Sequence, residues 1–406
     1  MGIDEGDPPC THIAISHRPH HGFPPQFSYP TGGYLRSVSD HVAQVFVVGS
    51  HSPTVSLTES LGERETPVGK TDALKVSRVR AALRGEPVDR PPMSFWGHDY
   101  LREWSAEDLA DTMLERHFKF DWDWMKVNPR AGYYCQVWGG VYRPSGNAFE
   151  PPRLVDHPVK GFSDLDRVEV LAPEHGALGE QLQAVSRISE RIDTLFIQTV
   201  FTPLSVFGHL IGIDPHYPTD SDTALLMKYL RTDPARSHRA LQAITDTLAG
   251  YAVQCLHRGA SGIFFAPVKW ASFLQMDEST YREFGRPYDL QILAAVSSAE
   301  FNVLHLCDSN VMFDLLADYP VHAVNWDTYA PGNPSLADGL RRAGKTVMGG
   351  VNRDPTLLGD RPDAVADEVR AARAITSNRR IMLTANCGIS PRVPEENLWA
   401  AKKANS

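Results

Sequence analysis

Long apolar runs are missing from this 406-residue sequence: no stretch of 18 apolar residues occurs, so there is no candidate for a membrane-spanning helix. The first five residues also lack the basic region and apolar segment of a secretory signal. Basic side chains are in deficit, with 40 Lys and Arg against 49 Asp and Glu. A net charge of −9 argues against the basic surface that nucleic acids and anionic membranes require. We therefore expect a cytoplasmic protein with a small-molecule substrate, no nucleic-acid partner and no membrane contact.

Cysteine is also scarce. The five cysteines are Cys10, Cys135, Cys255, Cys307 and Cys387, an odd number spread over nearly the whole chain. This usage does not predict a disulfide framework and fits reduced thiols. A functional cysteine here is expected to act as a thiolate.

Residues 1–70 lack the periodic apolar pattern of helices and strands. They contain six of the sixteen histidines, many Pro, Ser and Gly residues, and one short apolar run at 42–47. Such a segment cannot bury a core by itself. We expect a poorly ordered, low-complexity N-terminal extension over 1–70, with a histidine-rich metal-binding tail as the alternative. Residues 71–406 are then expected to form the folded domain.

From residue 71 onward, short apolar runs alternate with longer amphipathic segments. The apolar runs, expected to be strands, are 92–96, 122–128, 195–201, 262–266, 303–307, 321–327, 347–352 and 381–387. The segments expected to be helices are 72–84, 105–117, 177–191, 234–258, 278–299, 312–317, 336–343, 364–374 and 395–404.

Buried parallel strands need crossover helices, so this alternation predicts an α/β fold, a (β/α)₈ TIM barrel. Aromatic and turn residues in 132–158 interrupt the rhythm and predict a hairpin inserted after the second strand. A doubly wound sheet is the alternative, but no glycine-rich nucleotide-binding fingerprint follows any strand.

In such a barrel, functional side chains lie at the carboxyl ends of the strands. His305 and Cys307 end the fifth expected strand, and residues i and i+2 of a strand point to the same side. Cys387 ends the eighth. One nitrogen and two sulfurs suit tetrahedral Zn²⁺ and leave a fourth position for substrate. Asp327 ends the sixth expected strand, which follows that of His305. It is a candidate catalytic residue, either as a displaceable fourth ligand or as a base.

Each of these assignments has a plainer alternative. A His-x-Cys pair often arises by coincidence, and a buried cysteine commonly serves as a small apolar residue. Cys135 and Cys255 are interpreted as structural in this way. Asp121 and Asp123 are expected to point outward on one strand face, although a decarboxylase-like role for one of them stays open.

Further candidates lie at neighbouring strand ends. We expect one catalytic group and four substrate-binding groups there: His98, and Asn128, Gln198, Asn352 and Trp96. The alternative is that the polar ones cap loops and turns or satisfy backbone groups, and that Trp96 belongs to the core.

Several motifs carry a resemblance to a known family. The segment 79–97 (VRAALRGEPVDRPPMSFWG) is similar to the opening of the uroporphyrinogen decarboxylase superfamily, including its Arg-Pro-Pro. Residues 349–352 (GGVN) and 386–397 (NCGISPRVPEEN) are similar to its closing block. The resemblance covers roughly residues 72–404 in order and implies a (β/α)₈ barrel.

Within the superfamily, the chain looks more like the zinc-dependent branch of methylcobamide:coenzyme M methyltransferases and, more distantly, cobalamin-independent methionine synthase. The His-x-Cys and distant Cys of their zinc motif correspond to His305, Cys307 and Cys387. True uroporphyrinogen decarboxylases carry an arginine after the Arg-Pro-Pro that binds substrate propionates, whereas this chain has none before Arg102.

The resemblance implies a zinc-dependent methyl or alkyl transferase acting between a corrinoid, folate or other activated donor and a thiol-type acceptor. A corrinoid would arrive on a separate protein, because no Asp-x-His-x-x-Gly signature occurs, and a homodimer is also implied. Two alternatives remain open at this stage. One is a metal-independent decarboxylase of a tetrapyrrole or small acid, and the other is a non-catalytic corrinoid- or metal-binding barrel.

Overall fold

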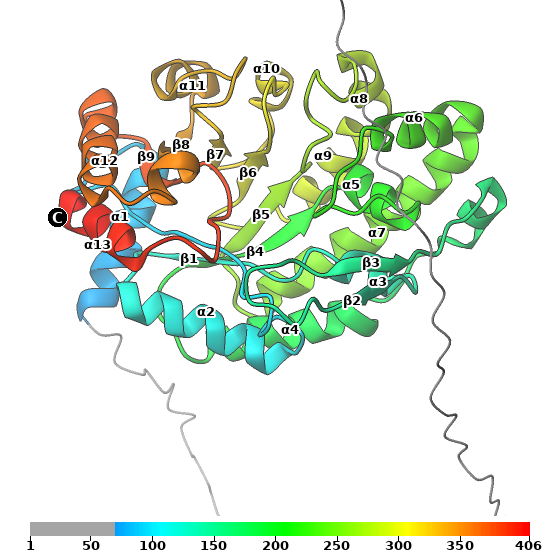
Figure 1. The fold of residues 1–406 in the computed structure, drawn as a ribbon, viewed down its shortest axis with the longest axis horizontal. Helices are drawn as coiled ribbons and strands as arrows, with labels where there is room; N and C mark the ends of the chain where they lie inside the picture. The colour runs from blue at the N-terminus through cyan, green and yellow to red at the C-terminus, as the bar shows by residue number, and fades with distance from the viewer. Residues whose placement is uncertain (1–69) are drawn as a thin grey trace, which may run out of the picture. The chain divides into compact units, whose positions relative to one another are not determined.

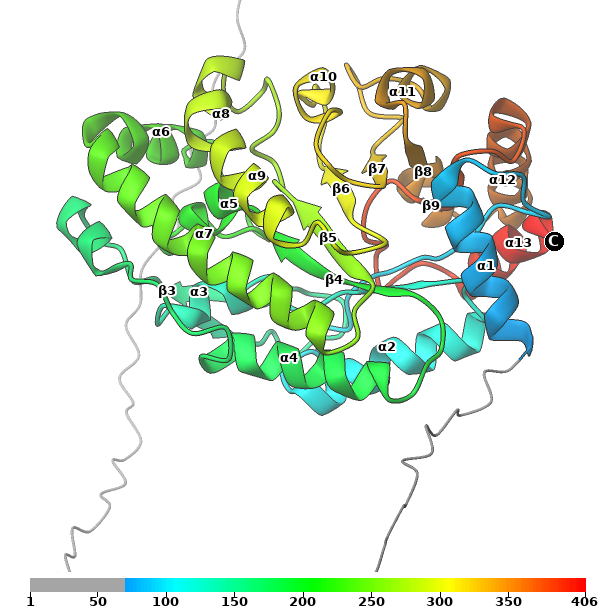
Figure 2. The same cartoon turned by 180° about the vertical axis from the view of Figure 1, so that it is seen from behind.

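A computed structural model describes residues 70–406, which fold around a curved parallel sheet surrounded by helices (Figures 1 and 2). The sheet has seven strands in the order β1-β4-β5-β6-β7-β8-β9. Their bounds are Met125–Val127 (β1), Phe196–Phe201 (β4), Gly262–Ala266 (β5), Val303–Leu306 (β6), Ala323–Trp326 (β7), Thr346–Val351 (β8) and Ile381–Ala385 (β9). Every neighbouring pair is parallel, and the spatial order follows the chain order. The barrel-type α/β architecture is confirmed, and the doubly wound alternative, whose strand order reverses, is excluded.

The first expected strand, 92–96, does not form a regular strand. It lies between β9 and β1 and makes isolated parallel bridges at Met93 with Leu383 and at Gly97 with Ile389. The Leu383 amide donates to the Pro92 carbonyl at 2.8 Å, and the Asp123 amide donates to the Met93 carbonyl at 3.0 Å. Pro91 and Pro92 have no N–H group, so this segment cannot supply a continuous ladder.

Most expected helices are present with shifted ends. They are Lys70–Arg84 (α1), Ala106–Phe120 (α2), Gly176–Ser189 (α4), Pro234–His257 (α7), Glu278–Phe284 (α8), Arg286–Ala295 (α9), Phe313–Leu316 (α10), Leu336–Ala343 (α11), Pro362–Thr376 (α12) and Glu395–Asn405 (α13). The single helix expected over 278–299 is wrong: it breaks into α8 and α9 at Gly285, directly before the Arg286-Pro287 start of α9. Proline at a first turn fits the start of a new helix but not a helix interior.

Some elements were not expected from the sequence. They are the helices Tyr133–Val137 (α3), Pro203–Leu210 (α5) and Asp222–Thr232 (α6), with the short turns Phe162–Arg167 (η1) and Arg353–Leu357 (η2). The expected hairpin is present as Val141–Arg143 (β2) paired antiparallel with Arg153–Asp156 (β3), after β1. The expectation of a poorly ordered extension over 1–70 concerns residues that, apart from Lys70, lie outside the described part of the chain.

The interior of the sheet is built in layers. Apolar side chains that pack together inside the barrel include Trp124, Ile197, Phe264, Val303, Ala323, Met348 and Met382. Because strand residues alternate between faces, side chains two positions further on point to the same interior one layer higher. Lys126, His305 and Asn325 follow Trp124, Val303 and Ala323 in this way. The sheet thereby directs these polar groups to one end of the barrel.

Asp123 corrects the expectation that both early aspartates point outward. Asp121 is exposed, but Asp123 is buried and accepts hydrogen bonds from Arg78 (2.7 Å), from Arg90 (2.7 and 3.0 Å) and from the Met93 amide (2.8 Å). Both aspartates precede β1, so the alternation of a strand does not apply to them. Asp123 joins α1 to the segment that fills the gap between β9 and β1.

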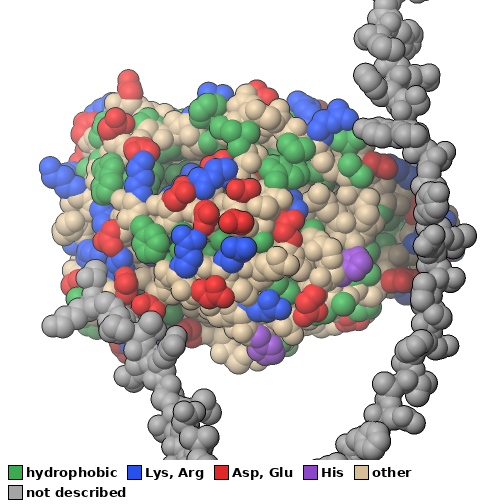
Figure 3. Space-filling view, turned by 90° about the horizontal axis from the view of Figure 1, so that it is seen from below, with side chains coloured by type: hydrophobic (Ala, Val, Ile, Leu, Met, Phe, Trp, Pro, Cys, Tyr) green, Lys and Arg blue, Asp and Glu red, His purple; other side chains and the backbone are tan. Residues whose placement is uncertain are grey.

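None of the helices formed by residues 70–406 combines the length and apolar character needed to cross a membrane. Figure 3 shows that acidic and basic side chains are interspersed on one face of the molecule.

Candidate metal centre and adjoining cavities

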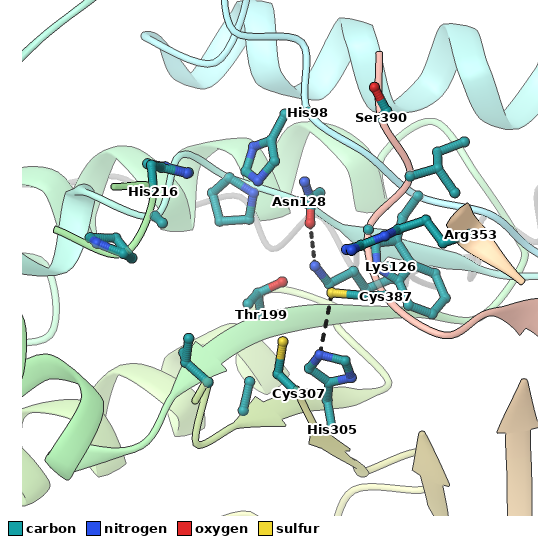
Figure 4. A pocket seen from close by; sticks show the side chains of 18 of the residues that line it. His98, Lys126, Asn128, Thr199, His216, His305, Cys307, Arg353, Cys387 and Ser390 are labelled. Atoms are coloured by element: carbon teal, nitrogen blue, oxygen red, sulfur yellow. Dashed lines mark hydrogen bonds between the residues drawn. The ribbon is translucent and has the colours of Figure 1, made fainter. Parts of the chain in front are cut away.

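Three side chains from two strand ends converge at the carboxyl edge of the sheet. His305 belongs to β6, Cys307 follows β6 directly, and Cys387 lies two residues beyond β9. One ligand atom from each lies within 4.8 Å of the other two. The Cys387 Sγ lies 3.5 Å from the His305 Nε2 (Figure 4). Within residues 70–406, His305, Cys307 and Cys387 are the one group of three or more His, Cys, Asp or Glu side chains close enough together to hold a metal ion.

The donor set fits Zn²⁺ in chemistry and in size. Zinc prefers imidazole nitrogen and thiolate sulfur, with bonds of about 2.0–2.1 Å and 2.3 Å. Tetrahedral angles between such bonds place the sulfur and the nitrogen roughly 3.5 Å apart. This equals the separation of Cys387 Sγ and His305 Nε2. His305 and Cys387 thus already have the separation of two ligands of one zinc ion, Cys307 lies within 4.8 Å of both, and a fourth position is left open.

Cys307 and Cys387 shift each other's pKa in opposite directions. A hydrogen bond from the Cys307 thiol lowers the pKa of Cys387, and the imidazole of His305 and the guanidinium of Arg353 lower it further. The same hydrogen bond, with burial, raises the pKa of Cys307. A bound cation would stabilise both residues as thiolates.

Asn325 fixes the orientation of the His305 ring. The Asn325 amide nitrogen donates to the carbonyl of Met348 at 2.9 Å, which turns its Oδ1 toward the His305 Nδ1 at 2.6 Å. This network assigns the proton to Nδ1 and leaves the Nε2 lone pair directed at Cys387. Phe264 stacks on the imidazole with ring centroids 5.0 Å apart. Ring position and tautomer are therefore both set before a metal binds.

Replacing Asn325 with alanine is expected to lower zinc affinity by about 10- to 100-fold, because the ring loses the acceptor that holds its tautomer. The measurement is a zinc titration in competition with a chelator of known affinity. Asn397→Ala is the matched control: Asn397 is also a buried amide, bound to the carbonyls of Leu357 and Gly359 at 2.8 Å, but it touches no ligand. Equal zinc affinities in the two variants would contradict a role for Asn325 in holding His305.

Two cavities adjoin the candidate metal group, the name used here for His305, Cys307 and Cys387. One cavity of about 520 Å³ is lined largely by aromatic side chains: Trp96, Tyr100, Phe149, Phe201 and Phe264. A second cavity of about 760 Å³ is more polar and includes Asp214, Asp308, Asp327 and Lys269. Cys307, Arg353 and Cys387 line both. Both cavities therefore give access to the two cysteines.

Three of the other predicted site residues line the aromatic cavity. The Nδ1 of His98 lies 2.7 Å from a carboxylate oxygen of buried Glu103, and its ring stacks on Tyr100. Asn128 accepts a hydrogen bond from Lys126 through Oδ1. Trp96 packs edge-on against Phe264 with centroids 5.3 Å apart. His98, Asn128 and Trp96 thus share one cavity with the metal group.

The structure does not bring Gln198 or Asn352 to either cavity. Gln198 lies on the outer face of β4, where its Nε2 donates to the Tyr251 hydroxyl of α7 at 2.9 Å. Thr199, one residue later, lines the aromatic cavity instead, because adjacent strand residues face opposite sides. Asn352 accepts from the Asp354 amide at 3.2 Å and caps η2. Their expected contact with substrate is therefore not supported by these positions.

Asp327 lies outside the metal group. Its Oδ1 accepts hydrogen bonds from the Tyr329 amide at 2.9 Å and the Ala330 amide at 3.1 Å, and its side chain lines the second cavity only. A short aspartate side chain at the end of a strand often stabilises a turn in this way. The structure thus assigns Asp327 to the loop after β7, rather than to a fourth ligand position.

Two cations beside the metal group were given no role by the sequence. Lys126 is buried: its Nζ donates to Asn128 and lies 4.7 Å from the Phe264 ring centroid and 5.8 Å from that of Trp96. Burial lowers the pKa of Lys126 to about 7, although the negative charge of Cys387 opposes this shift. Arg353 pairs with Asp354 at 2.6 Å. Lys126 and Asn128 lie two residues apart at the end of β1, so both side chains point inward. This spacing is the sequence signal that could have identified Lys126 as a site residue.

Comparison with known proteins places these observations in context. A family model described as uroporphyrinogen decarboxylase (URO-D) matches residues 145–404. A methylated-thiol–coenzyme M methyltransferase of Methanosarcina mazei is 25% identical over 276 residues, which cover 66% of this chain and 67% of that protein. A methylcobamide:CoM methyltransferase of the same organism is 23% identical over 354 residues, 81% of this chain and 96% of that protein.

Other relatives are decarboxylases. A uroporphyrinogen decarboxylase of Prochlorococcus marinus is 23% identical over 251 residues, 60% of this chain and 67% of that protein. Among solved structures, a methyltransferase from Methanosarcina mazei superposes with a TM-score of 0.69 at 22% identity, covering 82% of this chain and 98% of the other. That similarity supports the fold.

Proposed function

The chain belongs to the uroporphyrinogen decarboxylase (URO-D) family, and we propose that it is a zinc-dependent methyltransferase with a thiol as one of its two substrates. The observation that carries this proposal is the group formed by His305, Cys307 and Cys387, whose ligand atoms lie within 4.8 Å of one another beside open cavities. The methyltransferases among its relatives support the same reaction class.

The chemistry of the group suits thiol activation. A free thiol has a pKa of about 8.5 and is mostly protonated at neutral pH. Zinc bound by the three residues would stabilise a substrate thiolate, the nucleophilic form, through the open fourth position. Asn325 and Phe264 hold the imidazole in place.

The proposed reaction balances as a group transfer. The thiol loses its proton to solvent, and a sulfur lone pair forms the new sulfur–carbon bond. The bond between the methyl carbon and the donor breaks at the same time, and the donor keeps that electron pair. In this proposal the two adjoining cavities hold the two substrates, and transfer requires the sulfur and the donor to lie on opposite sides of the methyl carbon. In this proposal His98, held by Glu103, orients the substrate in the aromatic cavity.

The donor is proposed to be a methylated corrinoid, a folate or another activated methyl compound. The described residues include no corrinoid-binding sequence, so a corrinoid is expected on a separate protein. Its approach to Cys307 and Cys387 would then use one of the two cavities.

Decarboxylation of a tetrapyrrole is less well supported. A substrate with many carboxylates requires several cationic partners. The cations that line the aromatic cavity are Lys126 and Arg353, and Arg353 is already paired with Asp354.

The test is an assay of the zinc-loaded protein with methylcobalamin and a series of small thiols, followed by absorbance and by mass spectrometry of the methylated thiol. Methyl transfer is expected to exceed the protein-free rate by at least about 100-fold, to stop after chelation and to return with zinc. Metal-free protein that decarboxylates uroporphyrinogen would contradict the proposal. Binding of a corrinoid without any product would also contradict it.

A further inference from the structure

Lys126 is a buried lysine whose amine has no carboxylate within ion-pair distance in the part of the chain that the structure describes. Cations near the two cavities are otherwise paired: Arg353 with Asp354 at 2.6 Å and Lys269 with Asp222 at 2.6 Å. Within residues 70–406, no carboxylate lies within ion-pair distance of the Lys126 Nζ, although the side chain is only 6% exposed. A buried charge without a partner is costly, so its position in a cavity wall calls for an explanation.

The metal group does not supply the missing charge once its ion is bound. The thiolate of Cys387 acts on Lys126 in the metal-free protein. A divalent cation on Cys307 and Cys387 would neutralise these thiolates and leave Glu103, which makes no ion pair with Lys126, as the carboxylate whose charge still acts on the Lys126 amine.

A second unused donor lies beside Lys126. Asn128 uses its Oδ1 to accept from the Lys126 ammonium, which leaves its amide nitrogen as the free end of the side chain. The Asn128 Nδ2 is buried and has no hydrogen-bond partner. Both residues line the aromatic cavity, and Figure 4 shows them together above the metal group. An ammonium and an amide N–H side by side form a complementary site for the two oxygens of an acid group.

The rest of this cavity favours a flat apolar body. Its walls include the aromatic rings of Trp96, Tyr100, Phe201 and Phe264, which present faces and edges to a planar ligand. The carboxylate that lines it, Asp354, is already bound to Arg353. The lining therefore combines a single unpaired positive charge with aromatic surface.

We propose that Lys126 and Asn128 form an anion-binding subsite, and that the substrate in this cavity is a planar monoanion: an aromatic or heteroaromatic acid. The acid group contacts Lys126 and Asn128, and the ring lies among the aromatic walls. The further idea that this acid carries the reacting thiol, or its methyl thioether, rests on the function proposed above. The anion subsite itself does not rest on that function.

The experiment is calorimetric titration of the full chain with benzoate and with its neutral analogue benzamide, which carry no thiol and cannot react. Zinc content is measured separately on the same samples. Benzoate is expected to bind at least ~10-fold more tightly than benzamide. Lys126→Met should weaken benzoate binding by ~10-fold or more and leave benzamide unchanged, whereas Lys126→Arg should stay within ~3-fold of wild type.

Asn128→Ala provides a second variant if Lys126→Met does not fold, and it should also weaken benzoate selectively. Equal binding of benzoate and benzamide by the wild type, or benzoate binding that survives Lys126→Met, overturns the proposal. If Lys126→Met loses zinc but binds benzoate as the wild type does, the proposal is also overturned, because Lys126 then stabilises the thiolates rather than a bound acid. Selective benzoate binding to a chain that holds no zinc supports the anion subsite and refutes the zinc-dependent transferase. Failure of the subsite and failure of the proposed function are therefore distinguishable.

Discussion

Replacing Cys387 with serine is expected to reduce bound zinc from about one ion per chain to less than ~0.1. Serine keeps the size of the side chain but is a far weaker zinc ligand, and His305 with Cys307 alone provides too few ligands for tight binding. Thiol-dependent methyl transfer should fall by ~10³-fold or more. Metal analysis of the purified protein measures the first effect, and the methylcobalamin assay measures the second.

Cys255→Ala is the matched control for this change. Cys255 is a fully buried cysteine in α7, and it is not part of the metal group. The control should keep its zinc and its activity, with a modest loss of stability from the missing sulfur. Full zinc occupancy in Cys387→Ser would show that the ion, if present, is bound elsewhere.

Replacing Asp123 with alanine is expected to lower the free energy of unfolding by about 3–5 kcal/mol. Asp123 is 1% exposed and is the shared partner of Arg78 and Arg90, so its removal leaves Arg90 without a carboxylate partner and Arg78 with Asp89 alone. It also removes the acceptor of the Met93 amide in the segment that fills the gap between β9 and β1. Urea unfolding followed by circular dichroism measures the change.

The neighbouring aspartate provides the control. The side chain of Asp121 is 55% exposed and pairs with Lys75 and Lys402 near the end of α2. The Asp121 carboxylate is half exposed, and its buried partner Lys75 keeps a second carboxylate, Asp72 at 3.4 Å, so Asp121→Ala should cost less than Asp123→Ala. Similar losses in the two variants would show that the buried cluster around Asp123 does not hold this part of the barrel together.

The periodic pattern of the sequence was sufficient to predict much of the fold. Fully buried strands such as Gly262–Ala266 read as continuous apolar runs, and the helices between them show amphipathic spacing. The pattern failed where backbone chemistry overrides it. Pro91 and Pro92 prevent a regular first strand, and the helix expected over 278–299 breaks before Pro287.

The candidate site was predictable to the extent that strand alternation determines it. His305 and Cys307 lie two residues apart and point the same way, which is a local property. Whether Cys387 lies close to this pair depends on where β9 lies in the sheet. The expected order of the strands around a barrel provided that position. Gln198 was expected to contact substrate, but its side chain bonds to Tyr251 on the outer face of β4, and Thr199, one residue later, lines the cavity.

Other roles depend on contacts that a sequence does not show. Asp327 and Asn352 are polar residues at strand ends, like Asn128, yet their side chains are used by the backbone of their own loops. Asn325 matters because its amide is held by distant carbonyls, and Lys126 because it lacks a carboxylate partner. Neither property is encoded in a local motif.

X-ray absorption at the zinc edge of the purified, full-length protein is the decisive measurement. We predict one zinc per chain, with two sulfur ligands at about 2.3 Å and nitrogen at about 2.0–2.1 Å, and a third sulfur when a substrate thiol is added. Protein that takes up no zinc, or zinc surrounded only by oxygen and nitrogen, would contradict the assignment of His305, Cys307 and Cys387 as its ligands.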